Sequence, residues 1–180
     1  MNILAVSGSL RKKSYNTALL RAAQKLAPEL AIEILDMRGL PVFDQDLEET
    51  DFPAQVQEIR AKIQAADGVL LAVPEFNRTP AAPMKNFLDW SSRPENEPLP
   101  RTGKPVGIVG ASSGPRGASF AQYHVRSVMG YFNARVLGQP EFYLGNDADK
   151  FDTDLNLTDE KTISSLKKFL AAFKQHVEKN

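Results

Sequence analysis

A polar loop near the start of the chain carries the side chains best suited to chemistry. Apolar residues 3–6 are typical of a buried strand, and a helical pattern begins soon after them. Between the two lie Ser9, Arg11, Ser14 and Asn16. A helix N-terminus offers unpaired N–H groups and the positive end of the peptide dipole, so hydroxyls and a guanidinium placed there form a phosphate pocket. We therefore expect this loop to bind a phosphorylated small molecule.

The loop lacks two known phosphate-binding motifs, and this indicates which kind of phosphate it binds. It holds one glycine, Gly8, whereas a dinucleotide-binding fingerprint needs three, and it has no Gly-Lys-Ser/Thr sequence. Side chains and the backbone N–H groups of residues 14–17 must then do the binding, which suits a terminal phosphomonoester. Helix capping by Ser14 or Asn16 is the simpler alternative. Capping leaves Arg11 without a role, so we favour the phosphate.

Two further polar loops follow apolar runs and are candidates to bind the rest of the ligand. Residues 74–80, Pro-Glu-Phe-Asn-Arg-Thr-Pro, contain an aromatic ring and an amide that can border a flat ring system. Residues 112–117, Ser-Ser-Gly-Pro-Arg-Gly, are small enough for backbone N–H groups to approach a ligand and stabilise negative charge on it. An ordinary turn is the alternative for each loop. The convergence of three polar loops favours a site.

Strand and helix patterns alternate along the chain, so we expect one α/β domain over residues 1–180. Five strands are predicted by apolar runs at residues 3–6, 31–35, 68–73 and 106–111 and a weaker one at 134–137. We expect a parallel sheet of order 2-1-3-4-5 with helices on both faces. Ligands of such sheets bind beyond the carboxyl ends of the strands, where the three polar loops lie.

Composition excludes several classes of protein. The 22 basic residues balance 22 acidic ones, which argues against a nucleic-acid partner, and the absence of cysteine excludes disulfides and thiolate metal sites. No apolar run approaches the ~18 residues of a membrane span, so we expect no membrane partner and a cytoplasmic protein. Four aspartates within residues 146–156 lack the pattern of a calcium loop. We interpret them as a solvated loop and predict no metal site.

Groups able to transfer protons are few. His124 and His176 are the only histidines, and they are far apart in the sequence. A phosphate-binding site with few acid–base side chains fits a cofactor that carries the reaction itself.

The motifs resemble those of the NAD(P)H-dependent FMN reductase family, which includes quinone and chromate reductases and has the flavodoxin-like fold, a three-layer sandwich. The family's opening motif, Gly-Ser-x-Arg-x-x-Ser-x-Asn, is met by residues 8–16. Its second motif is Pro-Glu-Tyr-Asn followed by Leu-Lys-Asn-x-x-Asp-Trp, and it is met in register by Pro74-Glu75, Asn77, Lys85-Asn86 and Asp89-Trp90. With Gly-Lys-Pro-Val at residues 103–106 and the Ser/Gly loop at 112–117, the likeness covers nearly the whole chain.

The resemblance implies bound FMN, with NADPH or NADH as co-substrate. It implies ping-pong hydride transfer to a small-molecule electron acceptor, such as a quinone, an azo or nitro compound, chromate or free flavin. Family members are typically dimers or tetramers, so we expect a homodimer or homotetramer. The residues that would bind FMN are Ser9, Arg11, Ser14, Tyr15, Asn16, Thr17, Pro74, Glu75, Phe76, Asn77, Ser112, Ser113 and Gly114.

Departures from the family pattern lie in the second loop. Phe76 stands where the family has Tyr, which removes a hydroxyl, and Arg78 stands where the family has Gly. We expect Arg78 and Arg116 to lie on the substrate side of the flavin, where a cation can meet an anionic group.

Two alternatives come from other classes of protein. One is a non-enzymatic FMN-binding electron-transfer module, although such carriers are usually strongly acidic and this chain is neutral. The other is a flavin-free dinucleotide-binding protein in which Asp36 holds a ribose. The missing glycines argue against the second alternative.

Overall fold

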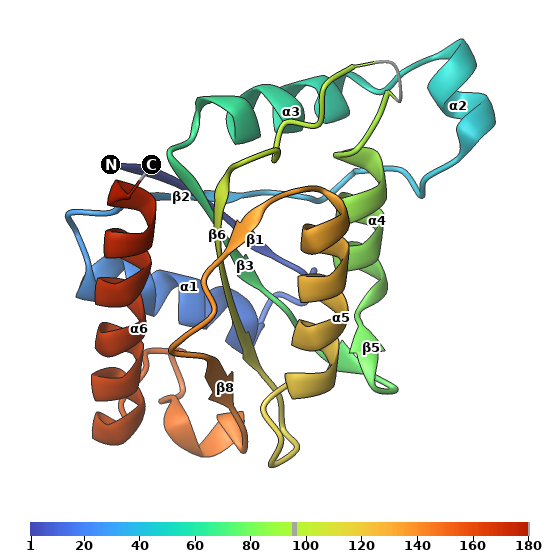
Figure 1. Ribbon diagram of the computed structural model, residues 1–180. Helices are drawn as coiled ribbons and strands as arrows, with labels where there is room; N and C mark the ends of the chain where they lie inside the picture. The colour runs from blue at the N-terminus through green and yellow to red at the C-terminus, as the bar shows by residue number, and fades with distance from the viewer. Residues whose placement is uncertain (95–96, 180) are drawn as a thin grey trace.

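The computed structural model describes residues 1–94 and 97–179 (Figure 1). Strands in chain order are β1 (Asn2–Ser7), β2 (Ala31–Leu35), β3 (Gly68–Ala72), β4 (Glu75–Phe76), β5 (Thr79–Pro80), β6 (Pro105–Ala111), β7 (Arg135–Val136) and β8 (Phe142–Leu144). The helices are α1 (Tyr15–Leu26), α2 (Gln45–Thr50), α3 (Ala54–Ala65), α4 (Ala82–Trp90), α5 (Ser119–Tyr131), the 3₁₀ helix η1 (Asp147–Lys150) and α6 (Glu160–Glu178).

The main sheet has the order β2-β1-β3-β6-β7, and its pairs are parallel. This is the predicted order 2-1-3-4-5, which is therefore confirmed. The chain leaves β1 toward β2 on one side and leaves β3 toward β6 on the other side, so the direction of winding switches between β1 and β3. The crevice at this switch point lies between the loops that follow β1 and β3.

The predicted number of five strands is wrong, because the last position of the sheet is filled by two short strands. β7 pairs with the start of β6 at Val106↔Val136, and β8 pairs with its end at Gly110↔Tyr143. Pro140 lies between the two short strands and has no N–H to donate to a ladder. The main sheet therefore has six strands.

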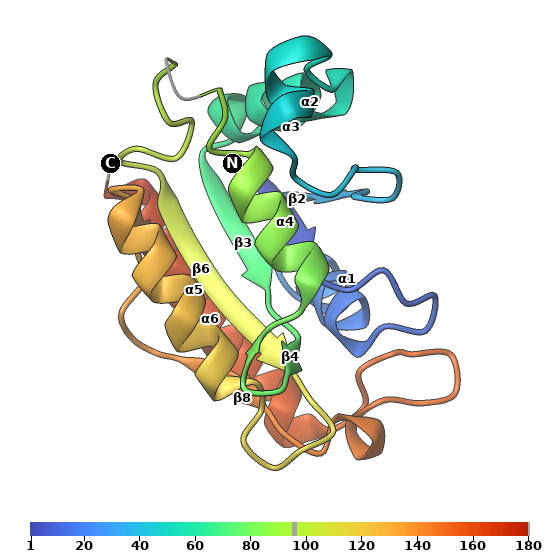
Figure 2. The same ribbon diagram turned by 90° about the vertical axis from the view of Figure 1, so that its right-hand side faces the viewer.

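Helices cover both faces of the sheet, as predicted. Figure 1 shows α5 and α6 on opposite sides of β6, and in Figure 2 α4 and α5 lie toward the viewer with α6 behind them. The apolar residues of α1 and α6 pack on one face, with Leu19 and Phe173 against Ile3 and Leu70. Those of α3, α4 and α5 form a second core on the other face. Successive residues of each central strand point to opposite faces, so burial of both faces explains the continuous apolar runs in the sequence.

A glycine allows the end of β6 to pack closely. A Cβ on Gly110 would lie 2.6 Å from the carbonyl oxygen of Val73 and 2.8 Å from the Nε2 atom of Gln122. Gln122 is fully buried on α5 and donates to the carbonyl of Phe142 at 3.0 Å. Gly110 therefore brings β3, β6, β8 and α5 together directly beneath the polar loops.

None of the helices in the described part of the chain is long and apolar enough to cross a bilayer.

Candidate functional site

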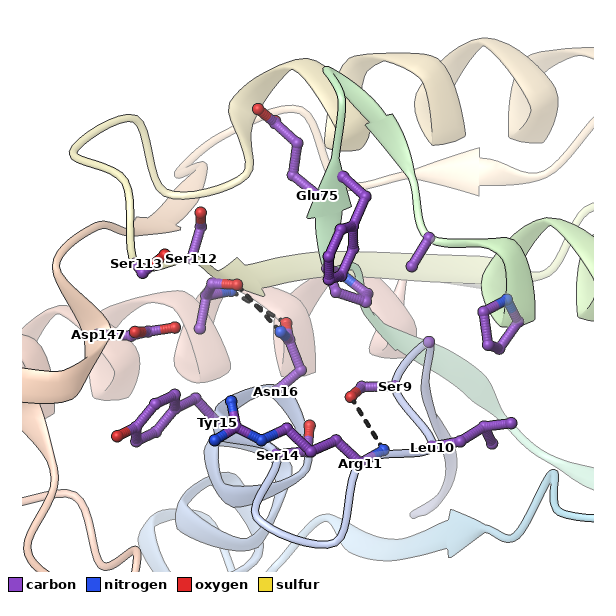
Figure 3. A pocket seen from close by; sticks show the side chains of 16 residues that line it. Ser9, Leu10, Arg11, Ser14, Tyr15, Asn16, Glu75, Ser112, Ser113 and Asp147 are labelled. Atoms are coloured by element: carbon purple, nitrogen blue, oxygen red, sulfur yellow. Dashed lines mark hydrogen bonds between the residues drawn. The ribbon is translucent and has the colours of Figure 1, made fainter.

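A pocket of about 400 Å³ lies beyond the carboxyl ends of β1, β3 and β6 (Figure 3). This volume falls within the usual range for small-molecule sites. The pocket brings together most of the predicted FMN-binding residues, namely Ser9, Arg11, Ser14, Tyr15, Asn16, Pro74, Glu75, Phe76, Ser112 and Ser113. It is also lined by Gly8, Leu10, Ala81, Pro83, Ala111 and Asp147, which the sequence did not single out as ligand-binding residues.

Five predicted residues do not line this pocket. Thr17 instead borders a neighbouring polar hollow, and its hydroxyl donates to Ser7 Oγ at 2.8 Å. The N–H of Gly114 donates to Ser112 Oγ at 3.2 Å and so shapes the third loop. Asn77 and Arg78 form the tip of a hairpin, and Arg116 lies in the third loop beyond the lining residues.

The first loop presents the start of α1 to the pocket. Ser14 is the N-cap, and its hydroxyl oxygen accepts from the N–H of Thr17 at 3.2 Å. The first main-chain helical bond runs from the N–H of Ala18 to the carbonyl of Ser14, so the N–H groups of Tyr15 and Asn16 precede it and remain directed out of the helix end. These groups, with the hydroxyl of Ser9, form an anion site at a positive helix terminus.

Arg11 adds a full positive charge to that site. Its side chain extends along the pocket beside Tyr15 and Asn16 (Figure 3). Within the described residues no carboxylate lies within 4 Å of its guanidinium nitrogens. A guanidinium without an internal partner is free to bind a phosphate through charge-assisted hydrogen bonds.

The Asn16 side chain has a structural task. Its Nδ2 donates to the carbonyl of Ala111 and its Oδ1 accepts from the N–H of the same residue, both at 3.0 Å. Asn16 is 5% exposed, so its side-chain amide is fully used by this pair of hydrogen bonds. It joins the start of α1 to the end of β6, and only the backbone N–H of Asn16 remains for a ligand.

The second loop is a hairpin of β4 and β5 with Asn77 and Arg78 at its tip. Both residues have positive φ, 48° and 69°, as a tight two-residue hairpin requires. At its base, the Glu75 carboxylate accepts from the N–H of Ala121 at 3.1 Å, in the first turn of α5. This contact between an acid and a helix N-terminus fixes the hairpin against α5.

Two guanidinium groups converge on one aromatic ring outside the pocket lining. Arg78 lies 5.2 Å and Arg116 5.8 Å from the centroid of Phe120, each in a cation–π arrangement. Glu75 lies 3.8 Å from Arg78. Phe76, which lines the pocket, is 68% exposed beside this cluster. The open side of the site is therefore cationic and aromatic.

Asp147 is the polar residue that sequence reasoning missed, and the interpretation of its loop as solvated is wrong at this position. Asp147 is 4% exposed and lines the pocket, and its N–H donates to the carbonyl of Ser112 at 3.3 Å. The loop follows β8, whose pairing beside β6 carries it to the same edge of the sheet. The short run Phe142–Leu144 was the signal that could have found it.

The charge of Asp147 is disfavoured where it lies. Burial raises the pKa of this carboxyl above its ordinary value, against the opposing effects of the Ala148 N–H and the Arg11 charge. No other acid in the described part of the pocket wall combines such burial with an unpaired oxygen.

The strand order and the pocket at the sheet's switch point define a flavodoxin-like protein. The model of the NADPH-dependent FMN reductase family matches residues 1–149, and the chain belongs to this family.

Several named proteins are similar along nearly the whole chain. An NAD(P)H-dependent FMN reductase of Pseudomonas aeruginosa is 38% identical over 173 residues, covering 96% of this chain and 92% of the relative. A 2-hydroxy-1,4-benzoquinone reductase of Burkholderia sp is 37% identical over 171 residues, covering 94% and 92%. Among solved structures, the flavoenzyme NAD(P)H:(acceptor) oxidoreductase FerB of Paracoccus denitrificans superposes with a TM-score of 0.90 at 34% identity, covering 99% of this chain and 97% of that one.

The raised pKa of Asp147 predicts a pH-dependent stability of the FMN-free protein. The folded chain holds the Asp147 proton more tightly than the unfolded chain does, so the free energy of unfolding falls as pH rises from the ordinary carboxyl pKa through the raised one. Asp147→Asn removes this loss. We expect the variant to melt at a higher temperature than the wild type near neutral pH, with a smaller difference in acid.

Thermal denaturation of both FMN-free proteins across pH measures this effect. Asp149→Asn, a change at an exposed carboxyl of the same helix η1, is the matched control. Equal melting temperatures of Asp147→Asn and wild type at every pH would contradict the assignment.

Proposed function

We propose that this protein reduces quinones with electrons from NAD(P)H through FMN bound in the pocket. As a member of its family it is an FMN-dependent oxidoreductase that uses NAD(P)H. The observation that carries the proposal is the joining of a phosphate site at the start of α1 to an open face between the loops after β3 and β6. Quinone as acceptor is supported by the Burkholderia relative and by the quinone reductase of Escherichia coli, which is 33% identical.

The residues present fit FMN from its phosphate to its ring. The Arg11 guanidinium, the Ser9 hydroxyl and the N–H groups at the start of α1 match a terminal phosphate dianion. When bound, FMN supplies the redox chemistry, accepting hydride from the nicotinamide and passing the electrons to the acceptor. The third loop contributes Ser112 and Ser113, whose backbone can stabilise negative charge at the ring edge.

The remaining polar groups position these residues. Asn16 fixes the first loop against the end of β6, and Glu75 fixes the hairpin against α5. Neither side chain needs to transfer a proton in this scheme. Because FMN supplies the chemistry and these side chains only position the loops, few acid–base groups are needed, as the sequence indicates. A cytoplasmic location, where NAD(P)H is regenerated, is part of the proposal.

The proposal is tested with purified protein loaded with FMN. We expect a flavin absorbance band near ~450 nm that NADPH bleaches under anaerobic conditions and that a quinone restores. Steady-state rates at several fixed quinone concentrations should give parallel double-reciprocal lines, as a ping-pong reaction requires. A protein that binds FMN but oxidises NADPH negligibly would instead be an electron-transfer module. A protein that does not bind FMN would contradict the whole proposal.

The Arg78–Phe120–Arg116 cluster suits an anionic group of the incoming substrate. Arg78 occupies a left-handed conformation that costs a non-glycine residue about 1–2 kcal/mol. Glycine would avoid that cost, so the retention of arginine favours a role for its charge. We infer that the two guanidiniums meet the 2′-phosphate of NADPH, which NADH lacks.

Arg78→Gly tests this inference without straining the hairpin. We expect kcat/KM for NADPH to fall about tenfold or more, the typical effect of a lost charge-assisted hydrogen bond, while the value for NADH stays within about twofold. Lys168→Ala on α6 removes an exposed cation elsewhere and controls for net charge. An unchanged ratio of the two kcat/KM values in Arg78→Gly would sink the assignment.

We also propose that the protein assembles as a homodimer or homotetramer through α5. The outward face of this helix exposes Phe120, Tyr123 and Tyr131, at 45%, 57% and 82%. Aromatic residues are enriched at interfaces between subunits. Light scattering should give a mass that is a multiple of the 19.9 kDa chain. A monomeric mass at micromolar concentration would contradict this assembly.

A further inference from the structure

A buried carboxyl oxygen in the pocket wall has no partner. Asp147 Oδ1 is buried and makes no hydrogen bond, while the backbone of the residue is bonded to Ser112. Packing against the third loop is tight, since a Cβ on the neighbouring Gly145 would lie 2.4 Å from the carbonyl oxygen of Pro115. Buried polar atoms are rarely left unsatisfied, so an unpaired oxygen in a ligand pocket indicates a missing donor.

The groups around Asp147 come from three elements and do not supply that donor. Figure 3 places Asp147 between Tyr15 of α1 and Ser113 of the third loop, with the Arg11 side chain nearby. Arg11 acts on the carboxyl electrostatically but does not lie within 4 Å of it. The Tyr15 ring packs against Phe151, 5.2 Å between centroids. The missing donor therefore comes from the pocket side.

The chemistry of this donor is restricted by the rest of the site. Among the described residues no group of three or more His, Cys, Asp or Glu side chains gathers around a possible metal, so a lone carboxylate here suits a hydrogen-bond donor. The same ligand places a phosphate at Arg11 and a ring near Phe76. Between phosphate and ring, FMN carries a ribityl chain with three hydroxyl groups.

We propose that Asp147 is a further FMN-binding residue whose carboxylate accepts a hydrogen bond from a ribityl hydroxyl. The inference rests on the binding of FMN in this pocket. It explains why an acid is retained at a position where burial disfavours its charge, since an O–H···O⁻ bond is among the stronger hydrogen bonds. The same carboxyl would then destabilise the empty protein and stabilise the loaded one.

The test compares two ligands that differ only in the hydroxyl groups. One is FMN, and the other is an analogue with the same ring and phosphate joined by an unsubstituted pentyl chain. Dissociation constants come from the quenching of flavin fluorescence. We expect Asp147→Ala to weaken FMN about tenfold or more and to leave the analogue within about twofold of wild type.

Control variants separate this role from others. Arg11→Ala should weaken both ligands, because both carry the phosphate. Asp149→Ala, at the exposed carboxyl on η1, should affect neither. Asp147→Asn keeps the shape of the side chain, and it should weaken FMN while raising the melting temperature of the FMN-free protein.

Three outcomes would overturn the proposal. Equal weakening of both ligands by Asp147→Ala would show a structural role for the carboxyl. Tighter binding of FMN would show that Asp147 only repels the phosphate. Unchanged FMN affinity in both Asp147 variants would show no contact. Failure of the proposed function is distinguishable, because the wild type would then bind neither ligand.

Discussion

The site depends on one buried side chain that joins two distant parts of the chain. Asn16 bonds both the N–H and the carbonyl of Ala111 at 3.0 Å, across 95 residues of sequence. These bonds place the positive end of α1 directly beside the end of β6. Hydrogen bonds of a buried side-chain amide are costly to lose, because each partner would remain desolvated and unpaired. The first loop, which carries Ser9 and Arg11, and the third loop at residues 112–117 are therefore held as one rigid wall of the pocket.

Around that wall, the protein tolerates locally unfavourable features in the pocket wall and in the neighbouring hairpin. Arg78 adopts a left-handed backbone conformation, and Asp147 leaves a buried oxygen without a partner. Residues of this kind persist when the surrounding structure determines their positions. Here the surrounding structure consists of two apolar cores, one on each face of the sheet, and of Glu75 at the start of α5.

The sequence predicted most of the fold because its central strands are buried on both faces. Continuous apolar runs such as those in β3 and β6 leave little ambiguity. β8 was missed because Phe142–Leu144 is only three residues long and follows Pro140. Because β8 was not predicted, the aspartate-rich loop that follows it could not be placed at the carboxyl edge of the sheet. Asp147 was therefore not recognised as a pocket residue.

The site residues were harder to interpret than to locate. A polar side chain at a helix start has the same sequence signature whether it binds a ligand, caps the helix or bridges to another strand. Ser14 caps α1 and Asn16 bridges to β6, as their partners show. Only the three-dimensional partners distinguish these tasks. Arg11 differs, because a guanidinium in the pocket without an internal carboxylate has its charge available to a ligand.

The division of the last sheet position into β7 and β8 also has a consequence for solubility. An uninterrupted outer strand exposes a row of unpaired N–H and C=O groups that can recruit a strand from another molecule. Here that row is broken by Pro140 and shortened to two and three residues, and Arg135 is further occupied by mutual contacts with His176 of α6. The interruption that carries Asp147 to the pocket thus also protects this edge of the sheet against intermolecular strand pairing.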